Sequence, residues 1–369
     1  MAKKQTQKKE KWQTLRRFFD LYKSDLSLNE IERLVKRDVP GVYEFYARKM
    51  EKPDQKRNWL VRTITFSRNF FMAFLLRLTA ARRLFYSVAL FLFFYGLITS
   101  LNQWIVLSFI VINILLALEV ADKLMAKDEL EIAREIQTGL MPKSAPKNFI
   151  YDLACFSEPA REVGGDYYDF IPSKLNSHFY IVVGDVSGKG MAAALYMVRI
   201  QALLQLILEK KDSPRDILID LNRNVRKILR HDYFISMAVS RIDTDGNFRF
   251  CRAGHMPLIH YSGRTGKCIT LEPGGIAVGL ENNGRFDQTI EEVTVNPHKN
   301  DILVYYTDGV TETRNHKKAE YGEVNLKKII TDNARESAEG IKAAILEDIA
   351  RFRGTEAPHD DLTIVVIKC

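Results

Sequence analysis

Residues 179–190 read FYIVVGDVSGKG, an apolar run that ends at an aspartate preceded by glycine. Apolar runs of this length that end at glycine are typical of buried β-strands. Four more short apolar runs, separated by turn signals, follow along the chain: YFISMAVSRI (233–242), NFRFCRAG (247–254), DILVYYTDGV (301–310) and DLTIVVIK (361–368). Helical patterns at 191–210, 214–230 and 336–352 lie among them. The sequence therefore predicts an α+β domain over residues 143–369.

Aspartates occur in the turns at the ends of the apolar runs. Four such turns are present: VGGDYYD (163–169), VVGDVSGKG (182–190), YYTDGVTE (305–312) and PHDDLTIVVI (358–367). Three of them place glycine beside aspartate, which lets the backbone turn sharply and approach a bound ion closely. A single Asp-Gly pair is typical of an ordinary hairpin turn. Four together favour one shared site.

Aspartates without histidine or cysteine neighbours suit hard cations such as Mg²⁺ or Mn²⁺ rather than zinc. Two such ions can share one water, lower its pKa and hold a phosphoryl group for in-line attack. The pattern therefore predicts hydrolysis of a phosphate ester.

Other catalytic signatures do not fit. GDVSGKG (184–190) is similar to a phosphate-binding P-loop, but its first glycine is one residue too close and Gly190 replaces the magnesium-binding hydroxyl. No G-x-S-x-G elbow or Cys/His nucleophile pattern is present, and His255 in AGHMP is interpreted as a structural loop histidine. The four cysteines are scattered without a C-x-x-C pair, which fits a reducing compartment.

Residues 84–118, LFYSVALFLFFYGLITSLNQWIVLSFIVINILLAL, carry no charge. As one helix they would be about 52 Å long, well beyond a ~30 Å hydrocarbon core. The polar run at 100–103 predicts two transmembrane spans instead, at 84–99 and 104–118, both shorter than usual. A re-entrant hairpin remains open. A hairpin buried in a soluble core is the other alternative, but apolar residues on every helix face disfavour it.

Basic charge is concentrated before these spans. The whole chain has a net charge of +8, yet residues 1–83 hold 21 Lys and Arg against 9 Asp and Glu, and the remainder holds 33 against 37. This asymmetry argues against nucleic-acid binding. Arginines precede the first span and Lys123 and Lys127 follow the second, so we predict a cytoplasmic membrane location with both ends in the cytoplasm. The basic, mostly helical segment 1–83 contacts anionic membrane lipid or simply carries solvated charge.

A linker helix is predicted over 119–142, ending at Met141-Pro142. Its apolar stripe is formed by Leu118, Ala121, Met125, Ile132, Ile136 and Leu140, and Asp128 and Glu129 interrupt it. Such a stripe packs either on its own domain or on a second copy as a homodimer coiled coil. Both interpretations stay open.

The order and spacing of these motifs over residues 128–369 resemble the PPM (protein phosphatase 2C) class of serine/threonine phosphatases, in the bacterial SpoIIE/RsbU branch. The matching motifs are ELEIAREIQTGLMP (129–142), REVGGDYYDF (161–170), GDVSGKGMAAAL (184–195), AGHMP (253–257), TDGVTE (307–312) and DDLT (360–363). The branch usually has NAGHNP where this chain has RAGHMP. We expect Arg252 and Met256 to alter loop packing or a substrate contact.

The resemblance implies a β-sandwich flanked by helices in α/β/β/α layers, with two Mn²⁺ or Mg²⁺ ions at one end. It implies the ligands Asp185, with the carbonyl of Val186 beside it, Asp308, Asp360 and Asp166. Asp185 would bridge both ions, Asp308 and Asp360 would complete the first, and Asp166 would reach the second. Asp361 remains an alternative to Asp360. Arg161 is either a phosphate-binding residue or a surface arginine.

The function implied is a membrane-tethered protein phosphatase that hydrolyses phosphoserine or phosphothreonine in one step, without a phospho-enzyme. The implied partner is a phosphorylated regulatory protein, a STAS-type anti-sigma-factor antagonist, and segment 119–142 governs activity and dimer formation in this branch. Two alternatives are a non-catalytic membrane scaffold that docks such a partner and a phosphatase for small phosphoesters. The presence of all four metal-site aspartates weighs against the scaffold.

Overall fold

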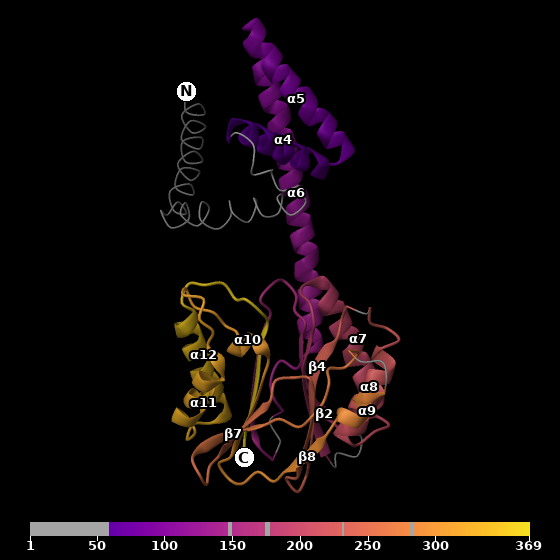
Figure 1. Ribbon diagram of the computed structural model, residues 1–369, viewed down its shortest axis with the longest axis vertical. Coiled ribbons are helices and arrows are strands. Elements are labelled where there is room, and N and C mark those ends of the chain that lie inside the picture. The colour runs from indigo at the N-terminus through magenta and orange to yellow at the C-terminus, as the bar shows by residue number, and fades with distance from the viewer. Residues whose placement is uncertain (1–58, 147–149, 174–177, 231, 281–283) are drawn as a thin grey trace, which may run out of the picture. The chain divides into compact units, whose positions relative to one another are not determined.

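The computed structural model describes residues 59–146, 150–173, 178–230, 232–280 and 284–369 (Figure 1). The chain divides into two compact units, Met1–Lys123 and Leu124–Cys369. Most of the predicted segment 1–83 lies outside the described residues. Its described part contains helix α4 (Trp59–Arg77) and the start of α5 (Ala80–Thr99).

Two five-stranded antiparallel sheets form the second unit. One sheet has the order β1 (Asp152–Glu158), β10 (Leu362–Lys368), β9 (Ile302–Tyr306), β6 (Leu258–Ser262) and β7 (Lys267–Leu271). The other has the order β2 (Asp166–Pro172), β3 (His178–Val186), β4 (Ile235–Asp243), β5 (Phe248–Ala253) and β8 (Glu292–Val295). All five apolar runs read from the sequence are strands, namely β3, β4, β5, β9 and β10.

Alternate residues of the central strands face two different apolar layers. Ile181 and Val183 of β3 belong to a buried cluster with Tyr305 of β9 and Val365 of β10, so this cluster lies between the sheets. The intervening Val182 belongs to a second cluster that includes residues of the flanking helices. Because successive strand residues point to opposite faces, a strand buried on both faces must be apolar throughout. This is why these runs are continuous.

Helices cover the outer face of each sheet, as Figure 1 shows for α7 and α8 on one side and α11 and α12 on the other. Their bounds are α7 (Met191–Leu208), α8 (Pro214–Val225), α11 (Gly322–Asp332) and α12 (Ala338–Arg353), and the short α9 (Arg285–Thr289) and α10 (Asp308–Thr311) complete this unit. Ser213 and Ser337 cap the N-termini of α8 and α12 through their hydroxyls. The predicted α/β/β/α sandwich is confirmed.

Three described helices are long and apolar enough to cross a membrane: α5, α6 (Asn102–Leu140) and α7. Helix α7 is different from the other two because its apolar side chains are used inside the second unit. Met197, Ile200 and Leu204 are buried in the cluster that it shares with the sheet. We therefore interpret α7 as a core helix and keep α5 and α6 as the candidate spans.

The apolar residues of α5 and α6 are mostly exposed, with Phe91 67% and Ile98 84% accessible. Ser100 adopts a left-handed conformation between the two helices, inside the polar run where the sequence predicts the connection. Both helices extend beyond the predicted spans 84–99 and 104–118. At 20 residues, α5 alone is about 30 Å long, which matches a bilayer core. Its charge-free part, residues 84–99, is only about 24 Å long because Arg82 and Arg83 lie in the first turn of the helix, so the predicted short span stays a prediction.

Small residues allow α5 and α6 to approach closely. The hydroxyl of Ser108 in α6 donates to the carbonyl of Ala89 in α5 at 2.7 Å. A Cβ atom on Gly96 would lie 2.8 Å from the side chain of Ile105, so a larger residue would separate the helices. Small residues at a close helix crossing are typical of membrane hairpins.

Polar contacts tie the charged end of this unit together. Arg82 pairs with Glu119 at 2.9 Å and with Asp122 at 2.7 Å, which joins the start of α5 to α6. Arg83 donates to the carbonyls of Leu75, Leu76 and Leu78 near the end of α4. These bonds satisfy carbonyls that a helix end leaves without intrahelical partners.

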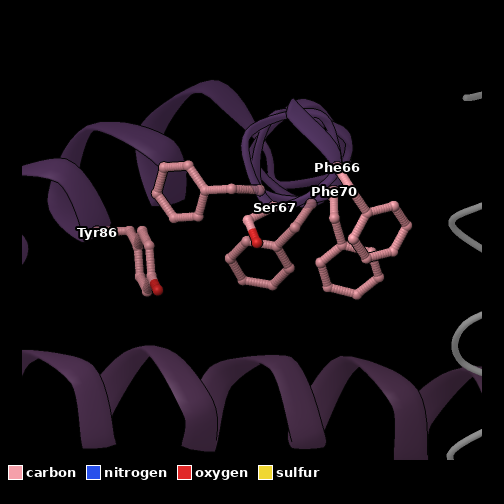
Figure 2. Close-up of a pocket in the computed structure, with 6 residues that line it drawn as sticks. Phe66, Ser67, Phe70 and Tyr86 are labelled. Carbon is pink, nitrogen blue, oxygen red and sulfur yellow. The ribbon is translucent and has the colours of Figure 1, made fainter. Parts of the chain in front are cut away.

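An aromatic pocket lies between α4 and α5. It is lined by Phe66, Ser67, Phe70, Phe71, Phe74 and Tyr86 (Figure 2). The Tyr86 ring contacts Phe74 edge-on, with the ring centres 5.4 Å apart. Aromatic pairs of this geometry add to the stability gained by burial.

We expect the full-length protein to remain in the membrane pellet after washes with about 1 M salt and with alkaline carbonate. Salt screens lysine attraction to lipid, whereas it does not weaken burial of apolar helices. Deleting residues 84–118 should release the chain, and the matched deletion of residues 1–58 should leave it in the pellet. Release of the intact chain by salt alone would contradict the span assignment.

Candidate active site

The antiparallel pairing of β2 with β3 brings the first two predicted aspartates together. Asp166 begins β2, Asp185 is the penultimate residue of β3, and the two are direct cross-strand partners. Directly opposed residues project from the same face of a sheet, with Cβ atoms about 4.5–5.5 Å apart. Two motifs 19 positions apart in the sequence therefore share one edge of the sandwich.

The other sheet supplies the remaining acids to the same place. Asp308 follows β9 and begins α10, while Asp360 and Asp361 immediately precede β10. The backbone at Gly309 packs so tightly on Asp361 that an added Cβ would lie 1.9 Å from the Asp361 carbonyl oxygen. Glycine is therefore required in the Asp-Gly pair for close approach of two loops, not for a hairpin turn.

Asp166 links the two sheets through hydrogen bonds. Its Oδ2 atom accepts from the hydroxyl of Thr307 at 2.9 Å and from that of Thr363 at 2.6 Å. Thr307 precedes α10 and Thr363 belongs to β10, so both donors come from the opposite sheet or its connection. A buried carboxylate is tolerated when it accepts several hydrogen bonds. This contact fixes the end of β2 relative to β9 and β10.

The carboxyl groups are close enough to perturb one another. Burial, followed by the charge of Asp185, raises the pKa of Asp166 well above its usual range. Burial and the charges of Asp308, Asp360 and Asp361 raise the pKa of Asp185 to about 7. Burial and the charge of Asp360 also raise the pKa of Asp308. Crowded carboxyl groups with raised pKa values are stabilised in their charged form by a cation.

Hard-cation chemistry fits this set of oxygen donors, although the side chains are turned toward protein partners. Among the described residues, no group of three His, Cys, Asp or Glu side chains is arranged as a ready-made metal site. The reason is local: Asp166 bonds the two threonines, and Asp360 pairs with Lys189 at 2.6 Å. The donor chemistry, rather than the rotamers of single side chains, is what favours divalent ions.

Asp360 and Asp361 have different surroundings. Asp361 Oδ1 accepts from the backbone N–H of Ala160 at 2.8 Å, and Oδ2 accepts from Gly165 at 2.6 Å. Both oxygens of Asp361 thus hold the loop that leads into β2. Asp360 instead pairs with a lysine whose side chain is 39% exposed, on the solvent side of the cluster.

The glycine pair before Asp166 makes room for the cluster. A Cβ on Gly165 would lie 2.7 Å from the carbonyl oxygen of Val186 and 2.9 Å from Asp185 Oδ1. The Val186 carbonyl is therefore beside the Asp185 carboxyl group, where the resemblance places a ligand. Arg161 lies next to Ala160 in the same loop, with an exposed side chain.

His255 has the surroundings of a structural residue. It is 3% exposed, its Nδ1 atom lies 2.9 Å from the Ser236 hydroxyl, and burial together with Arg252 lowers its pKa to about 3. Arg252 donates to the carbonyl of His255 at 2.6 Å and to that of Pro273 at 3.2 Å. The departure at Arg252 thus affects the packing of this loop.

Gln137 of α6 contacts the site, and the sequence reasoning missed it. Its side chain is 4% exposed, its Nε2 atom donates to the carbonyl of Gly164 at 2.6 Å, and its Oε1 atom accepts from the Gly164 N–H at 3.2 Å. The glutamine lies within the matching motif 129–142 but outside its apolar stripe, which is the signal that the sequence pattern provides.

That stripe is not packed on the domain in the described structure. Met125, Ile132 and Ile136 are 66%, 58% and 62% exposed. The interpretation in which the stripe packs on its own domain is therefore wrong for this arrangement. The interpretation in which it meets a second copy stays a prediction.

Comparison with known proteins agrees with this geometry. The sequence model of the Stage II sporulation protein E (SpoIIE) family matches residues 176–369. Phosphoserine phosphatase RsbU of Bacillus subtilis (strain 168) is 30% identical over 246 residues, which cover 66% of this chain and 70% of RsbU. Protein IcfG of Synechocystis sp. is 30% identical over 286 residues, which cover 69% of this chain and 44% of IcfG.

Solved structures with a similar fold include the SiaA-PP2C domain of Pseudomonas aeruginosa, with a TM-score of 0.59 and 21% identity over 68% of this chain and 98% of that one. The PP2C phosphatase domain of SpoIIE from Bacillus subtilis, with a fragment of its regulatory domain, has a TM-score of 0.51 and 19% identity over 61% of this chain and 64% of that one.

The fold and the relatives together define a protein serine/threonine phosphatase of the PP2C type. Within that class, the chain belongs to the SpoIIE family.

We expect Gln137→Ala to lower phosphatase turnover at least tenfold while the domain stays folded. The substitution leaves the buried N–H and carbonyl of Gly164 without partners, at a cost of about 1–3 kcal/mol each, and frees the loop before Asp166. Turnover and the thermal midpoint should be measured together. Thr138→Ala is the matched control, because Thr138 is exposed and its hydroxyl donates to the carbonyls of Arg134 and Glu135 in its own helix. Equal turnover in wild type and Gln137→Ala would show that this contact does not control the site.

Proposed function

We propose that this protein is a membrane-anchored, Mn²⁺- or Mg²⁺-dependent phosphatase that removes phosphate from serine or threonine of a regulatory partner protein. The observation that carries the proposal is the meeting of Asp166, Asp185, Asp308 and Asp360 at one end of the sandwich, with contributions from both sheets. The similarity to RsbU, named as a phosphoserine phosphatase, supports phosphoserine as a substrate group.

Four carboxylates and one carbonyl are the proposed ligands of two ions. Asp185 would contact both ions, with the Val186 carbonyl, Asp308, Asp360 and Asp166 completing their surroundings. When bound, such ions neutralise phosphate charge and lower the pKa of a water to make it a nucleophile.

We assign Asp361 a positioning role. Both of its oxygens already accept hydrogen bonds from the backbone of the loop before Asp166, so Asp361 would hold that loop in place and would not bind an ion itself. Asp360, which faces a lysine on the exposed side, is the better ligand of the two. Arg161 remains a weaker candidate for a phosphate contact.

The partner is proposed by family analogy as a STAS-type anti-sigma-factor antagonist. A phosphorylated residue of a partner protein can be hydrolysed only if the active site is open enough to admit a loop of that partner. Asp308 and Asp360 suit such a site because they lie where loops meet α10 and β10, not in the interior of the sheet. The alternative of a small-phosphoester phosphatase shares the same chemistry and differs only in the substrate that it accepts.

Membrane anchoring and regulation complete the proposal. Helices α5 and α6 would cross the inner membrane as a hairpin with both ends in the cytoplasm. Helix α6 continues without a break from Asn102 to Leu140, so one helix contains both the second span and Gln137. The exposed stripe at Met125, Ile132 and Ile136 is the proposed homodimer seam.

We expect Mn²⁺-dependent turnover of a phosphoserine protein, and a loss of at least a hundredfold in Asp308→Asn with the fold retained. Removing one ligand charge weakens ion binding and raises the pKa of the attacking water. Asp332→Asn is the matched control, because Asp332 is an exposed carboxylate at the end of α11.

The same assay should include a small aryl phosphate. Preference for the phosphoprotein supports the proposed function, whereas equal or better turnover of the aryl phosphate favours the small-molecule alternative. A folded, metal-loaded protein that hydrolyses neither substrate would leave the docking scaffold as the better description.

A further inference from the structure

Lys189, which lies between two glycines in GDVSGKG, contacts the cluster of acids. Its ammonium group donates to Asp360 Oδ2 at 2.6 Å and to the carbonyl of His359 at 3.0 Å. Among the described residues, Lys189 is the only basic residue that forms an ion pair with a member of the acid cluster. The cluster consists of Asp166, Asp185, Asp308, Asp360 and Asp361. Because GDVSGKG is not a P-loop, Lys189 is not assigned to nucleotide binding, and the proposed metal ligands do not include it.

Backbone conformation at the flanking glycines places this side chain. Gly188 and Gly190 have φ values of +95° and +77°, which residues with a Cβ atom rarely adopt. The chain leaves β3, turns at these glycines and enters α7 directly at Met191. Lys189 is thereby held at the edge of the site, across from the loop that precedes β10.

The charge of Lys189 reaches more than its direct partner. Its positive charge acts on the carboxyl groups of Asp185 and Asp308 as well as on Asp360. A phosphate monoester is itself an anion, so its approach to a group of carboxylates needs positive charge at the point of entry. A lysine at the exposed edge supplies such charge independently of bound ions.

The ammonium group also has the donors for this task. Lysine has three N–H donors, of which the contacts to Asp360 and His359 use two. The side chain is 39% exposed and has a flexible four-carbon stem, so the third donor can be turned toward an incoming oxygen.

We propose that Lys189 binds a phosphoryl oxygen of the substrate. This inference rests on the proposed phosphatase function and adds to it a phosphate-binding residue. The alternative is that Lys189 only offsets the charge of Asp360, and the two roles predict different responses to inorganic phosphate.

The test compares full-length wild type, Lys189→Met and Lys189→Arg, purified in detergent and loaded with Mn²⁺. We expect Lys189→Met to weaken binding of inorganic phosphate and to raise KM for the phosphoprotein by about tenfold or more, as for loss of one charged hydrogen bond. Lys189→Arg, which keeps the charge, should recover part of the phosphate affinity. Mn²⁺ affinity, measured by calorimetry, should be unchanged or tighter in Lys189→Met, because a competing cation has been removed.

Lys211→Met is the control for loss of a lysine charge. Lys211 pairs with Asp220 at 3.6 Å. It follows the C-terminal end of α7, whereas Lys189 precedes its N-terminal end, and the 18 residues of this helix are about 27 Å long. Phosphate binding should not change in this variant.

Two results would overturn the proposal. Phosphate affinity in Lys189→Met equal to that of wild type, with only Mn²⁺ affinity altered, would reduce Lys189 to a partner of Asp360. An equal loss of phosphate affinity in Lys211→Met would show a general charge effect. If wild type binds phosphate through Lys189 yet hydrolyses no phosphoprotein, the Lys189 assignment stands and the proposed function fails.

Discussion

The buried carboxylate of Asp166 accepts hydrogen bonds from Thr307 and Thr363 of the opposite sheet, and the arrangement of the other acids depends on this contact. A carboxylate in an apolar interior is costly without such donors. The end of β2 must therefore lie against the ends of β9 and β10 in the other sheet. Asp308, Asp360 and Asp361, which adjoin those strand ends, are then close enough to Asp185 for their charges to raise its pKa.

Like charges gathered at one edge oppose folding, and the rest of the sandwich offsets them. Burial and mutual repulsion raise the pKa values of Asp166, Asp185 and Asp308, so the charged form of each is disfavoured in the folded protein. The apolar layers on both faces of β3 supply the compensating stability. A site that is unfavourable for the protein alone has affinity for cations, and this links its stability to its chemistry.

Backbone atoms connect the site to the helix that leads away from it. Gly164 bonds Gln137 of α6, and the adjacent Gly165 bonds Asp361. A displacement of α6 along its axis would therefore act on the residue that precedes Asp166 by two positions. Each step of this path from α6 to the loop before Asp166 is a hydrogen bond.

The sequence by itself determined the continuous apolar strands, the glycine-flanked aspartates and the uncharged hairpin, because each follows from local periodicity and composition. Five strands were not predicted: β1, β2, β6, β7 and β8. Of these, β7 and β8 are only partly buried, and all five lack a long continuous apolar run. Only the tertiary structure decided which side chains meet across the sheets: Thr307 and Thr363 with Asp166, Gln137 with Gly164, and Lys189 with Asp360. These pairs join residues 27 to 197 positions apart, and each residue alone resembles an ordinary helix, strand or loop residue. Their roles arise from the folded register, which brings the ends of distant strands to one edge.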